Sequence, residues 1–502
     1  MVFSSLIFLY AFLPITLMLY AVGKKTNLRN YILLIASLVF YTWGEPVYVL
    51  ILVAMTFIDW LSALLIQNVC EKVRTKKLVL IITIAINLLI IGFFKYTGFF
   101  LSNVNAIFGV PETIPNIILP IGISFYTFQL ISYVVDVYRE EVPAQKKFSN
   151  LLLYSSLFYQ CIAGPIVRYS DVQNEIENRR INFTEVCEGI SRFSIGLGKK
   201  CLLANICGSL SDQLLVSDIF MNSPETVTAA LSEVASRSAV GVFFGVLFYM
   251  LQIYLDFSAY SDMAIGMGLM VGFHFKENFN YPYIANSVTD FWRRWHISLS
   301  RWLRDYVYIP LGGNRKGKVR RFVNLMLTFL VSGIWHGSGM QYLFWGAMQG
   351  GYQIAAELLM PVRKKVRALF KLEEDMPLLI LWQRVCTFAL ITISWVIFRS
   401  ASLRSGLSML KRIFTDITPW VFFDGSLFTC GITKHSFIAL LLMIVLVAII
   451  EHRQEKDNLR ETLEKQHGIV RWCIYLSAIA LIAVLGVYGP GYDATQFLYG
   501  QF

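Results

Sequence analysis

Charged residues are scarce in this sequence. They make up 15% of the 502 residues, whereas hydrophobic residues make up 56%. Soluble globular chains carry about 25% charged residues, so this composition excludes a string of soluble domains. The apolar residues instead form runs that approach the roughly 20 residues that a helix needs to cross a bilayer. Examples are Leu78–Phe94, Ala239–Leu255 and Trp472–Val487.

Paired cysteines and nucleotide-binding motifs are also missing. The eight cysteines form no C-x-x-C pair and have no zinc-site spacing. The sequence contains no P-loop, no G-x-S-x-G elbow and no dinucleotide fingerprint. Most cysteines lie in or beside apolar runs, where we interpret them as structural. We therefore expect neither a metal site nor a bound cofactor.

The net charge of +11 comes from Lys and Arg residues that lie between the apolar runs. This distribution is typical of cytoplasmic loops that face an anionic leaflet, and it argues against a nucleic-acid surface. The positive-inside rule predicts about twelve crossings with both termini outside the cytoplasm. The first crossing is a retained helix at Leu6–Val22. Leu151–Ile166 is too short to cross, so we predict a re-entrant segment. The loop Arg399–Arg412 should face outward although it is basic, and we predict an amphipathic helix there.

One histidine, His336, lies in the apolar stretch Val331–Gly337. An imidazole can act as a general base near neutral pH and then as an acid. Glycines on both sides of it leave room for a substrate or another helix to approach the ring. The alternative at this point is a hydrogen-bonded histidine that serves packing only.

The segment Asp290–Tyr306 is rich in tryptophan and arginine. Trp292, Trp295 and Trp302 are spaced by three and seven residues, which predicts one helical face and an aromatic belt at an interface. The segment either binds an anionic ligand or anchors the protein in the leaflet. Residues 293–321 contain nine Lys or Arg residues and one acid, so we place them in the cytoplasm. Leu311–Arg315 is predicted to be a turn.

Two carboxylates, Asp256 and Asp262, interrupt an apolar run and should face a cavity or partner charges. We favour structural pairing, with Arg293 or Arg304 as candidate partners. From these residues alone, the protein is a membrane enzyme or a transporter with a histidine-centred cavity.

Several motifs resemble the membrane-bound O-acyltransferase (MBOAT) superfamily, and specifically its bacterial alginate O-acetyltransferase branch. They include FWRRWHISLSRWLRDYVYIPLGGNR at Phe291–Arg315 and SGIWHG at Ser332–Gly337. Other segments that resemble this branch are MVFSSLIFLYAFLP at the start, YTWGEP at Tyr41–Pro46, Gly122–Arg139, Ala163–Tyr169 and Leu255–Gly266.

The resemblance implies an all-α polytopic membrane protein, with a ring of about twelve transmembrane helices and further re-entrant or interfacial helices around a central funnel. It implies one domain over residues 1–502, with a catalytic core at about 120–360 and an extracytoplasmic tail at about 488–502. His336 is implied as the catalytic histidine and His296 as a second one. The donor would be cytoplasmic acetyl-CoA, whose phosphates need cationic neighbours. The tentative donor-binding residues are Arg293, Arg294, Arg304, Trp295 and Asn324.

The chain ends in the pattern F-x-Y-x-x-F, which resembles a terminal motif associated with acyl relay and includes Tyr499. The resemblance implies that His336 activates Tyr499, which passes acetyl to an extracytoplasmic SGNH-type partner that acetylates a cell-envelope polysaccharide. The protein would lie in the bacterial cytoplasmic membrane. The alternatives are D-alanyl or peptidoglycan acyl transfer, an outer-interface anchor role for Tyr499, and a transporter. The sequence leaves the identity of the polysaccharide open.

Overall fold

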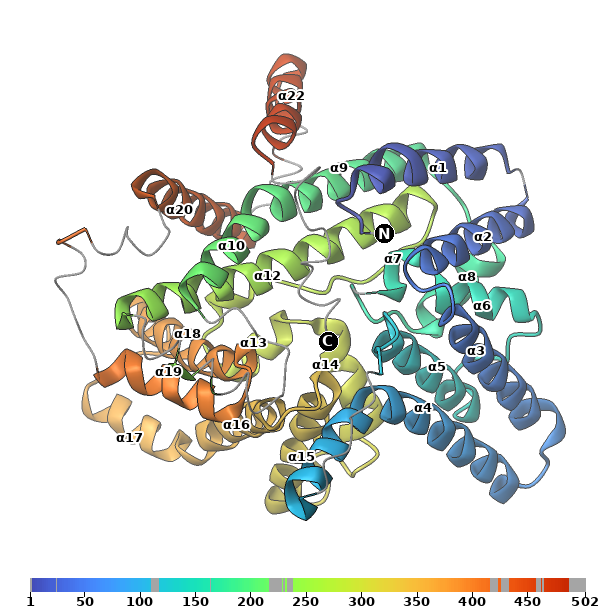
Figure 1. Cartoon of the computed structure of the whole chain (residues 1–502), viewed down its shortest axis with the longest axis horizontal. Coiled ribbons are helices and arrows are strands. Elements are labelled where there is room, and N and C mark those ends of the chain that lie inside the picture. The colour runs from blue at the N-terminus through green and yellow to red at the C-terminus, as the bar shows by residue number, and fades with distance from the viewer. Residues whose placement is uncertain are drawn as a thin grey trace. The chain divides into compact units, whose positions relative to one another are not determined.

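The computed structural model of the chain describes residues 2–23, 25–109, 117–162, 164–215, 228, 231–232, 238–415, 423–425, 433–456, 462 and 465–486. Every regular element within these ranges is a helix (Figure 1). Among them, four helices are long and apolar enough to cross a membrane, at Val49–Val69, Val73–Asn105, Ala239–Met270 and Pro377–Arg399. The predicted all-α polytopic membrane fold is confirmed, whereas the twelve-helix ring stays a prediction.

The chain divides into two compact units. The described part of the first unit comes from Met1–Leu197 and Phe257–Asn278. Its helices are η1 (Phe8–Phe12), α1 (Leu13–Val22), α2 (Thr26–Gly44), α3 (Val49–Leu64), η2 (Leu65–Val69), α4 (Val73–Phe108), α5 (Ile123–Tyr138), α6 (Phe148–Ser156), α7 (Phe158–Cys161), α8 (Tyr169–Glu177), α9 (Phe183–Gly198) and the second half of α12 (Ala239–Met270).

The second unit comes from Gly198–Asp256 and Phe279–Val487. Besides the first half of α12, it contains η3 (Lys199–Ala204), α10 (Asn205–Leu214), η4 (Pro282–Ile284), α13 (Val288–Arg294), α14 (Ile297–Leu303), η5 (Arg304–Tyr308), α15 (Lys318–His336), α16 (Met340–Leu358), α17 (Met360–Leu369), α18 (Pro377–Arg399), α19 (Leu403–Thr415), α20 (Lys434–Lys456) and α22 (Gly468–Leu485).

Helices α3 and α4 show how the first unit suits a lipid solvent. Large apolar side chains on α4 are exposed, among them Leu89 and Phe93. Polar side chains instead meet between the two helices, where the Asn87 amide donates to both carboxylate oxygens of Asp59, at 3.0 and 3.1 Å. Hydrocarbon offers no hydrogen bonds, so polar groups in a membrane protein pair with each other inside the protein.

The segment predicted to be re-entrant contains two short helices, α6 and α7. They are nine and four residues long, and neither is long enough to cross a bilayer. Nearly all of their side chains are buried. The segment is therefore not a span, as predicted, and its depth relative to a membrane stays a prediction.

The two carboxylates of α12 form structural ion pairs as predicted, but the predicted partners were wrong. Lys200 Nζ lies 2.6 Å from Asp256, and Arg192 lies 2.7 Å from Asp262. Arg304 pairs instead with its neighbour Asp305. Six residues of α-helix turn by about 240°, so Asp256 and Asp262 point in different directions and meet different neighbours.

The first residue of the basic loop Arg399–Arg412 explains part of this loop's conflict with the positive-inside rule. Arg399 is buried, and its guanidinium donates to Asp212 at 2.6 Å and lies 4.7 Å from the centre of the Tyr249 ring. A buried, paired arginine is not a free loop charge, so it says little about orientation. The helix predicted to follow is present as α19, and its Arg404 and Lys411 are exposed. Its position at an interface stays a prediction.

The buried Lys200–Asp256 pair gives a first testable prediction. Lys200→Met leaves the Asp256 carboxylate buried without its cation, and we expect it to destabilise the protein by about 3–5 kcal/mol. The double variant Lys200→Met/Asp256→Leu removes both charges and should recover most of that loss. Thermal unfolding midpoints of the three proteins in detergent provide the measurement. Equal midpoints for the single variant and the wild type would show that the pair contributes nothing.

Candidate functional site

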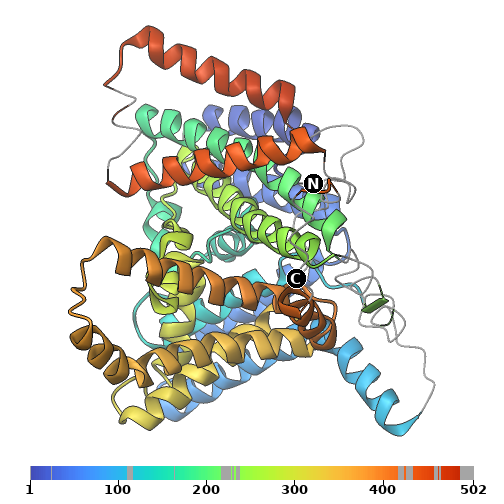
Figure 2. The same ribbon diagram turned by 90° about the vertical axis from the view of Figure 1, so that its left-hand side faces the viewer.

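His336 is the last residue of α15, and close packing of α15 against α16 fixes its position. The two helices lie side by side (Figures 1 and 2). A Cβ atom on Gly333 would collide with the Tyr342 carbonyl oxygen, and one on Gly346 would collide with the Phe329 carbonyl oxygen. The glycines therefore permit backbone-to-backbone contact. The room that the sequence predicted beside the ring is taken, at Gly333, by another helix.

Aromatic rings surround His336, which is only 3% exposed. Its ring centre lies 4.7 Å from that of Trp335, 5.2 Å from that of Trp345 and 5.2 Å from that of Phe398. All three rings meet the imidazole edge to face. The histidine is thus held rigidly by side chains from α15, α16 and α18.

Several buried polar atoms near this ring have no hydrogen-bond partner within the part of the chain that the structure describes. They are Ser332 Oγ, one helical turn before His336, and the indole nitrogens of Trp345 and Trp395. Trp345 and Trp395 stack on each other with ring centres 5.8 Å apart. Buried polar groups are almost always hydrogen-bonded, so a cluster of such atoms indicates a place where a substrate or water supplies the partner.

The second predicted histidine, His296, joins α13 to α14. Its backbone has φ = 41°, in the left-handed region that costs a non-glycine residue energy; strained residues of this kind cluster at functional sites. The side chain is 1% exposed, and burial lowers its pKa to about 3, so the ring is neutral at physiological pH. Its ring centre lies 6.2 Å from that of Trp335. Trp335 therefore neighbours both histidine rings.

The predicted tryptophan belt was wrong. The left-handed backbone at His296 ends one helix and begins another, so Trp292, Trp295 and Trp302 do not share a helical face. All three are buried, Trp295 to 1% exposed, among rings that include Phe291 and Trp395. Trp292 and Trp295 belong to the aromatic core that includes Trp345 and Trp395, whereas Trp302 packs against Tyr306. A tryptophan repeat alone cannot distinguish such a core from an interfacial belt.

The tentative donor-binding residues occupy different environments. Arg293 is exposed on α13, Arg294 pairs with Asp290 at 3.1 Å, and Arg304 pairs with Asp305 at 2.7 Å. Asn324 is fully buried and donates to the Gly313 carbonyl oxygen at 2.9 Å. That contact fixes the predicted turn, in which Gly312 and Gly313 have φ of 111° and 54°. Only glycine adopts the first of these values without strain.

Sequence reasoning missed a polar chain that ties three helices together beside the aromatic rings. The Trp292 indole donates to Gln349 Oε1 at 3.0 Å, and Gln349 Nε2 donates to Ser394 Oγ at 2.7 Å. Both polar residues are buried. Gln349 and Ser394 are polar residues within largely apolar helices, a signal that could have pointed to them.

The sequence profile of the MBOAT, membrane-bound O-acyltransferase family, matches residues 140–400, which include both histidines. The chain is 41% identical over 419 residues to a protein named probable alginate O-acetylase AlgI from Pseudomonas aeruginosa, covering 83% of this chain and 75% of that protein. It is 38% identical over 458 residues to a protein of the same name from Azotobacter vinelandii, covering 90% and 85%.

A peptidoglycan O-acetyltransferase from Helicobacter pylori is 35% identical over 442 residues, covering 82% of this chain and 79% of that protein. The identities and coverage extend well beyond the histidine motifs. The chain therefore belongs to the membrane-bound O-acyltransferase family, in its alginate O-acetyltransferase branch, and is an acyltransferase.

Proposed function

We propose that this protein takes acetyl from cytoplasmic acetyl-CoA and relays it across the membrane for O-acetylation of an extracytoplasmic polysaccharide. The observation that carries the proposal is the buried His336 in its aromatic enclosure, beside three polar atoms that lack partners among the described residues. The names of the relatives, alginate O-acetylase and peptidoglycan O-acetyltransferase, support a cell-envelope polysaccharide as the acceptor.

The first proposed step transfers acetyl to Tyr499, which lies outside the described residues. A phenol has a pKa of about 10, so it needs a base to attack a thioester at neutral pH. His336 takes the phenol proton while the Tyr499 oxygen attacks the acetyl carbonyl carbon. The new C–O bond forms, the C–S bond breaks, and the imidazolium returns the proton to the departing CoA sulfur.

Charge builds on the carbonyl oxygen during this attack. Preorganised donors that lie in a water-excluded site stabilise such a charge most effectively. The buried indole N–H groups of Trp345 and Trp395 and the Ser332 hydroxyl are the candidate donors, because none of them donates a hydrogen bond to a described residue. Their stabilisation of the reacting group would compensate for burying them without a protein partner.

The second proposed step moves acetyl from Tyr499 to an extracytoplasmic SGNH-type partner. A nucleophilic oxygen of the partner attacks the acetyl carbonyl carbon, the aryl ester bond breaks, and the Tyr499 oxygen regains its proton. The partner then acetylates the polysaccharide. The proposed setting is the bacterial cytoplasmic membrane with both termini outside, so that Tyr499 and the partner share a compartment.

Among the three arginines proposed for the donor's phosphates, Arg293 is the best placed. It is exposed, whereas Arg294 and Arg304 each have a carboxylate partner with which a phosphate would compete. Buried Trp295 and Asn324 would act indirectly, by holding the aromatic core and the Gly312–Gly313 turn in place.

Replacing His336 tests the central claim. Loss of a general base costs about 100- to 10,000-fold in rate, so His336→Ala should lower acetyl transfer from acetyl-CoA to polysaccharide by that factor. The assay uses labelled acetyl-CoA and membranes that contain the protein and its partner. His452→Ala, at an exposed histidine of α20, is the matched control. Undiminished transfer by a normally expressed His336→Ala protein would exclude a catalytic role for His336 and favour a transporter.

Tyr499→Phe tests the relay separately. The substitution keeps an aromatic anchor and removes the nucleophilic oxygen. After incubation with acetyl-CoA, mass spectrometry of the C-terminal peptide should show an added acetyl group in the wild type and none in Tyr499→Phe, and polysaccharide acetylation should cease. Continued acetylation by Tyr499→Phe would leave His336 as a catalyst that uses a different acceptor. Transfer from a D-alanyl donor but not from acetyl-CoA would identify the alternative acyl group.

The buried, neutral state of His296 predicts how its loss affects the pH profile. Because its pKa is about 3, its protonation does not change between pH 5.5 and 8.5. We expect His296→Asn to reduce the rate less than His336→Ala does, with the same profile shape as the wild type over that range. Initial rates measured at half-unit pH intervals provide the check. Loss of an inflection in the His296→Asn profile would show that His296 titrates during catalysis.

A further inference from the structure

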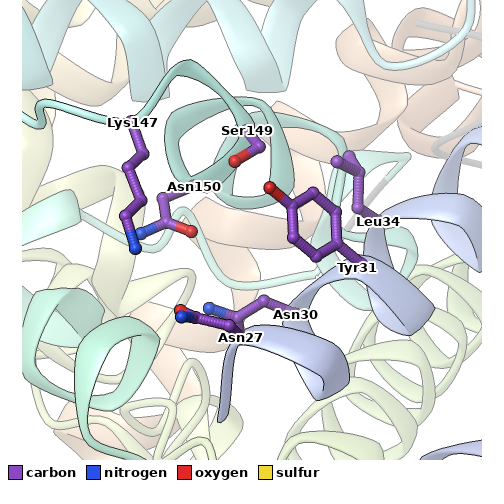
Figure 3. A pocket seen from close by; sticks show the side chains of 7 residues that line it. All are labelled: Asn27, Asn30, Tyr31, Leu34, Lys147, Ser149 and Asn150. Atoms are coloured by element: carbon purple, nitrogen blue, oxygen red, sulfur yellow. The ribbon is translucent and has the colours of Figure 1, made fainter. Parts of the chain in front are cut away.

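A polar hollow with an accessible volume of about 50 Å³ lies in the first unit, between the beginnings of α2 and α6 (Figure 3). It is lined by Asn27, Asn30, Tyr31, Leu34, Lys147, Ser149 and Asn150. The proposed acetyl transfer uses none of these residues.

The lining has the chemistry of an anion site. Among the described residues that line the hollow, Lys147 is the only lysine or arginine, and none is an aspartate or glutamate. Figure 3 shows the Lys147 and Asn150 side chains on one side of the space and Asn27 and Asn30 on the other. A lysine surrounded by amide and hydroxyl donors is suited to phosphate oxygens.

Asn150 indicates that the hollow is built for a ligand. Its side chain is 7% exposed and lines the hollow, yet it forms no hydrogen bond with any residue that the structure describes. Asn30, by contrast, is held on both sides: its amide donates to the Ile176 carbonyl oxygen at 2.7 Å and its oxygen accepts from Arg179 at 2.8 Å. The Asn150 amide is therefore available to a ligand or water in the hollow.

Backbone and buried charge add to the positive potential. Asn27 is in the first turn of α2, and Ser149 and Asn150 are in the first turn of α6. Neither helix has a side-chain cap. Helix N-termini carry partial positive charge and bind phosphate groups. Arg179, itself buried, places a full positive charge behind Asn30.

An apolar stripe leads away from the hollow along α2. Leu28, Tyr31, Ile35 and Val39 follow at spacings of three, four and four residues, and each is exposed by 50–62%. This spacing puts them on one helical face, and Tyr31 belongs to both the stripe and the hollow. A free phosphate ion would gain nothing from this face, whereas the acyl chains of a lipid would cover it.

We propose that the hollow binds the phosphate group of an anionic phospholipid, with the lipid's acyl chains lying along the α2 stripe. The positive-inside prediction puts the start of α2 and the loop ending at Lys147 on the cytoplasmic side, where anionic lipids are concentrated. Lys147 and Asn150 contact the phosphate, Asn30 and Arg179 supply the positive surroundings, and Tyr31 lies at the junction of headgroup and chains.

Thermal unfolding in nanodiscs tests the proposal. The full chain is placed in phosphatidylcholine nanodiscs with increasing phosphatidylglycerol, and in separate discs of phosphatidylcholine alone with inorganic phosphate in the buffer. We expect the unfolding midpoint to rise with phosphatidylglycerol and not with inorganic phosphate. Lys147→Gln should need about fivefold more phosphatidylglycerol for half the rise. Asn150→Leu, which removes the amide at similar size, should also respond weakly.

Lys146→Gln is the matched control, because it removes the same charge from the neighbouring exposed position outside the hollow. It should respond to phosphatidylglycerol as the wild type does. An equal loss of response in Lys146→Gln and Lys147→Gln would overturn the proposal in favour of general attraction to a charged leaflet. A full rise with inorganic phosphate alone would overturn the lipid assignment, and no rise with either probe would remove the site. Midpoints in phosphatidylcholine alone show that each variant is folded.

Discussion

The contact between the backbones of α15 and α16 is the constraint on which the site depends. Gly333 and Gly346 let the helices approach until main-chain atoms touch, and a methyl group at either position would meet a carbonyl oxygen. Lipid does not drive helices together through the hydrophobic effect, so close packing between small residues has a large share in holding such a pair. The pair places His336 at the end of one helix and Trp345 on the other, and α18 completes the enclosure with Phe398.

Polar residues within the membrane segments also show which helices are neighbours. Asp59, Asp256, Asp262 and Arg399 each have a charged or amide partner from another helix. These contacts offset the cost of burying polar groups and specify which helices adjoin. In the aromatic enclosure, the Ser332 hydroxyl and the indole nitrogens of Trp345 and Trp395 have no hydrogen-bond partner among the described residues.

Sequence patterns correctly predicted the helical membrane class, the short segment near Leu151 and the turn at Gly312–Gly313. Each of these rests on local composition or on a motif. The patterns failed where the answer depends on tertiary contacts. The spacing of Trp292, Trp295 and Trp302 suggested one helix face because nothing in the spacing reveals the left-handed residue at His296. The partners of Asp256 and Asp262 were misassigned for the same reason, because sequence distance does not show which neighbour a helix face meets.

The sequence leaves two roles open for His336, packing and catalysis, and the surroundings of its ring support the catalytic proposal. A packing histidine and a catalytic histidine both belong in an apolar helix, and both are buried. A histidine that served packing alone would be expected among neighbours whose own polar groups are paired, because any unpaired donor beside it weakens the core. Here the neighbouring indoles of Trp345 and Trp395 keep their donors, and a strained, neutral His296 is brought against the same Trp335 ring. In the proposed acyl transfer, a negative charge develops on the carbonyl oxygen. Unpaired donors beside a rigidly held base could stabilise that charge.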